Sequence, residues 1–339
     1  MRRSVLRIIR FTIFLAIGLI LLYFAFRGVS VEELLSSFRM ADFKWVAFAL
    51  LFALVGYVSR AYRWKLLIRP LNFDPPLKHV FYALMIGYTA NFAFPRIGEI
   101  SRCGTLRRSD KIPLDSLLGT VIIERAIDLV VLFVILIVVF FSKIGFFGAF
   151  FRNNIFEPFL SRIDSFFQFS LLKGVIFGAS VAALIFLVWF LNRKYSKSPV
   201  IGKIKELVRG VILGLKTIFR MKDRWTFIFH TLLIWLMYFL MTYVLLFALP
   251  STSHLSPLDG MFLLVIGGLG MSAPVQGGIG AFHWIVTLGL SLYEVSRADA
   301  VTYATLSHES QSIFAITLGA LSFIMLMIEN RRALKPNKS

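Results

Sequence analysis

Long apolar runs, separated by short polar and charged stretches, dominate the hydropathy pattern of this chain. The clear runs cover residues 11–26, 45–67, 117–141, 171–191, 225–247 and 312–328. A bilayer is crossed by a helix of roughly 17–25 predominantly apolar residues. The pattern therefore predicts an all-α polytopic membrane protein with about six full spans.

Three further apolar stretches, 79–94, 258–274 and 280–293, are shorter and contain or adjoin Gly, Pro or polar residues. The loop charges decide how the first of them is threaded. The linker 193–224 has ten basic and two acidic residues, so the positive-inside rule predicts that it is cytoplasmic. The spans before this linker leave it on the cytoplasmic side only if the segment 78–115 turns back without crossing. The sequence therefore predicts that 78–115 is a re-entrant hairpin entered from the cytoplasm.

The same rule places the loop 248–257 outside, because it has no Lys or Arg, and places both basic termini inside. Residues 258–293 must then return to the outside, either as two short crossings or as one hairpin entered from outside. Helical spacing also predicts a short outer helix over 31–38 and interfacial helices over 155–167 and 201–219. We expect a single membrane domain, 1–339, with pseudo-halves of about 1–142 and 171–330 that an interfacial segment joins.

Composition agrees with this class of protein. Apolar residues make up 58% of the chain, charged residues 16%, and the mean hydropathy is +0.78. The single cysteine, Cys103, excludes an internal disulfide. A net charge of +19 would indicate nucleic-acid binding in a soluble protein, but here it fits cytoplasmic loops against anionic lipid headgroups, and we expect no nucleic-acid partner.

Two interrupted segments share the pattern Pro-x-x-Gly, at Pro95/Gly98 and at Pro274/Gly277. Paired Gly/Pro-interrupted segments in the two halves of a membrane protein indicate a transporter site near the midplane. Their freed amides can face a polar ligand, and a helix N-terminus there favours phosphate. The backbone positions expected at this site are Asn91, Pro95, Gly98, Pro274, Gly277, Gly278 and Gly280. The alternative is two ordinary helix–loop–helix turns.

Glu124, Arg125 and Asp128 lie seven to eleven residues inside the run 117–141, or about 10–16 Å deep at about 1.5 Å per residue. Buried charges are costly in a membrane, so they must face partners or water. One interpretation is a neutralised cluster that pins this helix to the first hairpin through Arg96, Glu99 and Arg102.

The other interpretation is a site for an anionic headgroup, with Arg125, Arg96 and Arg102 as phosphate ligands. The basic residues at the end of the second span are expected instead to reach the cytoplasm by snorkelling; they are Arg60, Arg63, Lys65 and Arg69.

In the second half the polar residues of interest are Gln276, His283, His308 and Glu309. Intramembrane histidines usually serve as hydrogen-bonding partners, and no HExxH-like spacing, P-loop, nucleophile elbow or dinucleotide fingerprint occurs. We therefore predict no metal, no cofactor, no catalytic residue and no enzyme activity.

These motifs resemble a known family. They are Pro95-Arg-Ile-Gly98-Glu99-x-x-Arg102, Ser116, Glu124-Arg125-x-x-Asp128 and Pro274-x-x-Gly277-Gly278-Ile-Gly280. Over nearly the whole chain the sequence is similar to the lysylphosphatidylglycerol synthase transmembrane-region family, also called flippase-like or UPF0104. The resemblance implies an inner-membrane protein that handles lipids. In two-part relatives the membrane part is thought to flip an aminoacylated phospholipid that a separate soluble domain makes.

The sequence departs from that family in two places. Eleven residues follow Ile328, so we expect no synthase domain and no synthesis of the lipid by this chain. His283 stands where the family often has Glu.

The function predicted is a flippase that moves a phosphate-bearing lipid or lipid-linked precursor across the cytoplasmic membrane, with an anionic phospholipid as partner; the sequence sets no oligomeric state. The alternatives are an enzyme acting on a lipid-linked sugar, with Glu124 or Asp128 as base, and a non-catalytic member of a lipid-biosynthetic complex.

Overall fold

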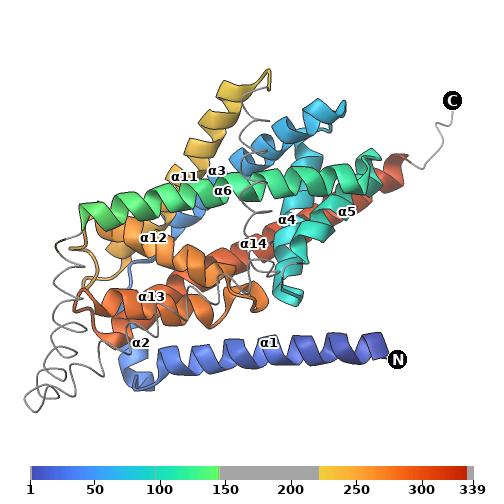
Figure 1. Cartoon of the computed structure of the whole chain (residues 1–339). Coiled ribbons are helices and arrows are strands. Elements are labelled where there is room, and N and C mark those ends of the chain that lie inside the picture. The colour runs from blue at the N-terminus through green and yellow to red at the C-terminus, as the bar shows by residue number, and fades with distance from the viewer. Residues whose placement is uncertain (1, 96, 144, 146–220, 334–339) are drawn as a thin grey trace, which may run out of the picture.

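A computed structural model describes residues 2–95, 97–143, 145 and 221–333. Within these residues all regular structure is helical, as predicted. The helices are α1 (Arg2–Phe26), α2 (Val31–Met40), α3 (Phe43–Ile68), α4 (Leu77–Ala93), α5 (Gly98–Asp110), α6 (Leu114–Ser142), α11 (Arg224–Leu245), α12 (Pro257–Ser272), α13 (Ala281–Ser291) and α14 (Arg297–Ala333), with 3₁₀ turns η1 (Arg69–Leu71), η3 (Leu246–Ala248) and η4 (Gln276–Gly278) (Figure 1).

The outer surface of the bundle is apolar. Large side chains such as Ile122, Phe133 and Leu232 are about 60% exposed, a pattern that suits contact with lipid rather than water. Three described helical segments, 43–71, 224–248 and 297–329, are long and apolar enough to cross a membrane, and α1 with α2 forms a bent pair that could count as a fourth span.

The predicted runs 11–26, 45–67 and 117–141 fall within α1, α3 and α6, the run 225–247 covers α11 and the start of η3, and the short helix predicted over 31–38 is α2. The last span is corrected, because α14 begins at Arg297 rather than near Ser312. Its first turns carry Thr302, Ser307 and His308, which face inward and are buried, so the hydropathy signal was weak there. The predicted span 171–191 and the interfacial helices 155–167 and 201–219 lie outside the described residues, and the count of six spans stays a prediction.

The first interrupted segment forms a helical hairpin of α4 and α5. The residue before Pro95, Phe94, is extended (φ −143°, ψ 134°), as a following proline favours, and this ends α4. A Cβ on Gly87 would lie 2.8 Å from the carbonyl oxygen of Gly98, so the two helices pack at glycine distance. At the other end His79 Nδ1 lies 2.9 Å from Asp110 Oδ1, and the hairpin therefore returns to the end at which it started.

The second interrupted segment is also a helical hairpin, made of α12, η4 and α13. Ser256 and Asp259 form a capping box at the start of α12, and the turn after Pro274 uses the left-handed region at Gly277 (φ +56°). Helix α13 has 11 residues, about 16 Å at about 1.5 Å per residue, which is too short for a core of about 30 Å. Residues 258–293 thus have the shape of a hairpin, one of the two arrangements left open by the sequence.

The two hairpins enter from opposite ends and meet at their tips. Helix α6 directly follows the first hairpin, and its far end contacts the base of the second through the ion pair of Lys143 and Asp259. At the tips, the ring of Phe92 packs against Gly277. Helix α1 starts, and α14 ends, at the same end of the molecule, on the right in Figure 1.

Candidate functional site

Glu124 lies at the centre of a buried charge cluster. Arg60 donates from Nε (3.0 Å) and Nη2 (2.7 Å) to its Oε1, and Arg102 Nη1 lies 3.0 Å from its Oε2. Glu124 is 0% exposed, Arg60 5% and Arg102 3%. The carboxylate therefore ties α6 to both α3 and the first hairpin.

Asp128 lies one turn further along α6 and shares the same cations. Its Oδ2 accepts from Arg60 Nη2 (2.9 Å), and its Oδ1 lies 2.7 Å from Arg63 Nη2. Arg60 Nη1 donates to the Tyr238 hydroxyl at 2.7 Å, which joins α11 to the group. We refer to Arg60, Arg63, Arg102, Glu124 and Asp128 as the charge cluster; its three cations face two anions, for a net charge of +1.

Aromatic rings support two of these arginines. The guanidinium of Arg63 lies 5.9 Å from the ring centroid of Phe227. The guanidinium of Arg102 lies 4.5 Å from the ring centroid of Trp64, whose Nε1 donates to Thr120 Oγ1 at 2.9 Å. Cation–π stacking of this kind is favourable when the cation is desolvated. The positions of the charged groups are thus fixed by packing as well as by ion pairs.

The prediction that Arg60 and Arg63 snorkel to the cytoplasm was wrong. Their side chains are 6% and 0% exposed and are used inside the protein. They lie three residues apart on one face of α3, opposite Glu124 and Asp128, which lie four apart on one face of α6. Two buried carboxylates require cations nearby, and that requirement was the available signal.

Arg125 does not join the charge cluster. Its side chain is 49% exposed, and Nη2 donates to Glu99 Oε1 of α5 at 2.7 Å. Glu99 and Arg102 thus both connect the first hairpin to α6, which is the pinning arrangement that the sequence suggested. Arg96 lies outside the described residues.

A cavity of about 620 Å³ lies where the two hairpins and the helices α3, α6, α11 and α14 come together. Its surface is mostly apolar, with Leu129, Leu132 and Leu264 among the lining side chains. The charged side chains of the lining are Arg60, Arg125 and Asp128, and α14 adds His308, Gln311 and Ser312 among the polar ones. Arg125 and Met271 line the cavity and are about half exposed, so it is open between α6 and α12.

The hairpin-tip residues have separate tasks. Asn91 Oδ1 accepts from the Gly98 N–H at 2.7 Å and so caps α5, and Asn91 and Gly277 also line the cavity. Gly278 and Gly280 have positive φ, and Gly280 packs against the backbone of Gly18 in α1. Gln276 Nε2 donates to the Phe11 carbonyl at 3.3 Å, so this residue joins η4 to α1 and is absent from the cavity lining.

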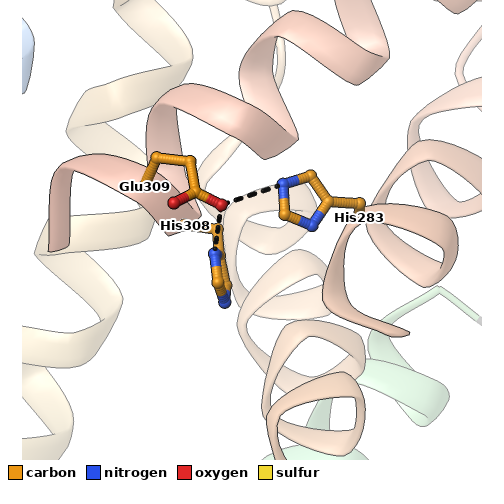
Figure 2. A group of neighbouring side chains, drawn as sticks. All are labelled: His283, His308 and Glu309. Atoms are coloured by element: carbon orange, nitrogen blue, oxygen red, sulfur yellow. Dashed lines mark hydrogen bonds and ion pairs between the residues drawn. The ribbon is translucent and has the colours of Figure 1, made fainter. Parts of the chain in front are cut away.

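On α13 and α14 a second polar group gathers, as Figure 2 shows. Glu309 Oε1 lies 2.9 Å from His308 Nδ1 and 3.6 Å from His283 Nε2. His308 Nε2 lies 2.8 Å from the Gly277 carbonyl oxygen at the hairpin tip. Apart from Gln276, which bonds to α1, the described polar residues predicted for the site form two groups: one around Glu124 and Arg125, the other around Glu309.

Together, the outward apolar surface, the two opposed hairpins and the charged cavity between them define a multi-pass membrane protein. A sequence model of the lysylphosphatidylglycerol synthase TM region matches residues 9–319. The chain belongs to that family.

The chain is also similar to a UPF0104 membrane protein of Methanocaldococcus jannaschii, at 20% identity over 96% of this chain and 97% of that protein. No solved structure matches the chain. The family resemblance drawn from the sequence motifs is confirmed.

Proposed function

We propose that this protein moves a lipid with a phosphate-bearing headgroup across the cytoplasmic membrane, with both termini on the cytoplasmic side. The observation that carries the proposal is the cavity at the meeting point of the two hairpins, apolar over most of its surface and cationic at one wall. A lipid has the same division, with an apolar body and a charged head. The lipid-related family supports this class of substrate.

Charge at the cavity favours an anion. The charge cluster carries a net charge of +1, and the Arg125–Glu99 pair adds none. In a medium of low dielectric constant one uncompensated positive charge attracts an anionic headgroup more strongly than it does in water.

Arg125 is the phosphate ligand in this proposal. Its hydrogen bond to Glu99 uses Nη2, and a guanidinium has five N–H donors arranged to bind phosphate through two of them at once. Arg60 is less available, since Nε, Nη1 and Nη2 already donate to Glu124, Tyr238 and Asp128. Glu99 would then orient Arg125 toward the cavity.

The experiment is lipid translocation in liposomes that contain the purified protein. Fluorescent phosphatidylglycerol in the inner leaflet should become accessible to an external quencher faster than in protein-free liposomes. Conversion of a lipid-linked sugar into a product without translocation would favour the membrane-enzyme alternative, and neither activity would favour a non-catalytic partner.

Arg125→Lys tests the assigned ligand, because it keeps the charge and loses the bidentate fork. We expect normal insertion and melting but a translocation rate at least about tenfold lower, the loss of roughly 1.4 kcal/mol of binding. Arg69→Lys is the control, since Arg69 also pairs with carboxylates, Asp74 and Asp223, but lies outside the cavity lining. Full translocation by Arg125→Lys would remove the phosphate role from Arg125.

A further inference from the structure

The hydrogen-bonding pattern of His308 requires a proton or a metal cation between His308 and Glu309. A backbone carbonyl only accepts, so the 2.8 Å contact with Gly277 places the proton of a neutral His308 on Nε2. Its Nδ1 then carries no proton and can only accept a hydrogen bond. It lies 2.9 Å from a carboxylate oxygen of Glu309, which is also an acceptor. The Ser312 hydroxyl lies 3.5 Å from the same Nδ1 and can donate to it, but it supplies no proton between Nδ1 and the Glu309 oxygen.

A third electron-pair donor converges on the same point. His283 is 2% exposed, and its Nε2 lies 3.6 Å from the same Glu309 oxygen (Figure 2). Within the described residues its Nδ1 has no hydrogen-bond partner, so this cluster is the polar contact that His283 makes there. A buried imidazole aimed at the shared oxygen suggests that a cation belongs between the three groups.

We propose that His283 Nε2, His308 Nδ1 and Glu309 Oε1 bind a divalent transition metal of the zinc type. The three atoms lie within 4.8 Å of one another. Around a tetrahedral zinc, with bonds of 2.0–2.2 Å, neighbouring ligand atoms are about 3.3 Å apart, and the observed 2.9 Å and 3.6 Å fall on either side of that separation. Small side-chain movements would complete the site.

The surroundings have two further features of a zinc site. Metal-binding histidines usually donate their second nitrogen to a carbonyl or carboxylate, which fixes the tautomer, and Gly277 supplies that carbonyl here. Two histidines and one glutamate form a ligand set that leaves a fourth position for water or another ligand. The Glu309 side chain is 43% exposed, which gives an ion a route to the site.

A bound ion would join α13 to α14 and, through the contact of His308 with the Gly277 carbonyl, to the η4 turn at the hairpin tip. His308 also lines the cavity, so the ion would add positive charge near that wall. The inference does not rest on the proposed lipid transport, because binding is measured without any lipid movement.

The test is metal binding by the full chain, purified in detergent with a tag that contains no histidine. After treatment with EDTA and dialysis against Zn²⁺, we expect about one zinc per chain by mass spectrometry. Co²⁺ in place of zinc should give the intense visible absorption of a tetrahedral ion, and either metal should raise the melting temperature. No retained zinc, or only the weak spectrum of octahedral Co²⁺, would overturn the proposal.

The variants His283→Asn, His308→Gln and Glu309→Gln should each lose the bound zinc and the metal-dependent rise in melting temperature. His230→Gln is the matched control, because His230 is also a helical histidine, on α11, but bonds to Ser59 outside this cluster. Zinc retained by all three cluster variants, or lost equally in the control, would assign the binding to adventitious sites. Because the wild-type Co²⁺ spectrum is read separately, the proposal stays testable if a variant fails to fold.

Discussion

Replacing Glu124 by Gln should strongly destabilise the fold, because it removes one of only two anions among three buried arginines. Arg60 and Arg102 contact Glu124 at 2.7–3.0 Å, and Arg63 lies 3.6 Å away. Two charges about 4 Å apart attract by about 4 kcal/mol at an effective dielectric constant of ~20. Much of this offsets the cost of removing the ions from water, and the net loss on breaking a buried pair is about 3–5 kcal/mol.

Cys103 provides the assay. It is the single cysteine of the chain and is fully buried next to Arg102, so a thiol-reactive dye reports unfolding during a thermal ramp in detergent. Glu124→Gln should react at a markedly lower temperature than the wild type. Glu99→Gln is the control, because the Glu99–Arg125 pair is 26% and 49% exposed and such pairs contribute only about 0–1 kcal/mol.

A second substitution separates charge imbalance from lost packing. Arg102→Gln in the Glu124→Gln background removes the excess cation, so the double variant should recover at least about 1 kcal/mol relative to additivity. If Glu124→Gln melts like Glu99→Gln, the charge cluster does not hold α6 against α3 and the first hairpin by electrostatic attraction.

Three further predictions concern the hairpins and the cytoplasmic end. Gly98→Ala places a methyl group on the Gly87 carbonyl oxygen and should lower the melting temperature, whereas Gly104→Ala, with nothing within 4 Å of the new Cβ, should not. Hydrogen bonds from Arg69, and to a smaller extent from Lys65, lower the pKa of Asp74 below its ordinary 3.8. The stability that the Asp74 carboxylate adds is therefore present above pH 3.8 and lost in stronger acid. The difference in melting temperature between the wild type and Asp74→Asn should vanish in that acid range. In a Cys103→Ser background, Asp74→Cys should label from the cytoplasmic side and Ser253→Cys from the outside, and labelling of both from one side would contradict the topology.

Features that depend on a residue's own backbone or charge could be predicted from the sequence, whereas contacts between distant helices could not. Proline and glycine act on their own backbone, so the breaks at Pro95 and Pro274 were visible, as was the need of Glu124 and Asp128 for partners. The cations that pair with these carboxylates are set by the packing of α3 against α6, which the sequence does not show. In the sequence, Arg60 and Arg63 stand at the end of an apolar run, as snorkelling residues also do. His283 comes from α13 and Glu309 from α14, so no short spacing marks their meeting.

The roles expected for the two Pro-x-x-Gly motifs differ in the structure. At Gly277 the glycine supplies a left-handed turn (φ +56°). At Gly98 it permits close approach of α4 and α5. Identical spacing thus serves two physical purposes, because the neighbour across the turn, and not the motif, decides which property of glycine is needed.

Photocrosslinking can show whether a phosphate headgroup binds in the cavity beside Arg125. A photoreactive phenylalanine analogue at Phe92, which lines the cavity, is compared with one at Phe323, which is 53% exposed on the outer face of α14. The labelled probes are phosphatidate and diacylglycerol, which differ only in the phosphate. We expect a saturable phosphatidate adduct at Phe92 that is weak with diacylglycerol and weak in Arg125→Lys, and non-saturable adducts with both probes at Phe323. Equal adducts of both probes at Phe92, or none, would show that the cavity does not bind a phosphate headgroup beside Arg125.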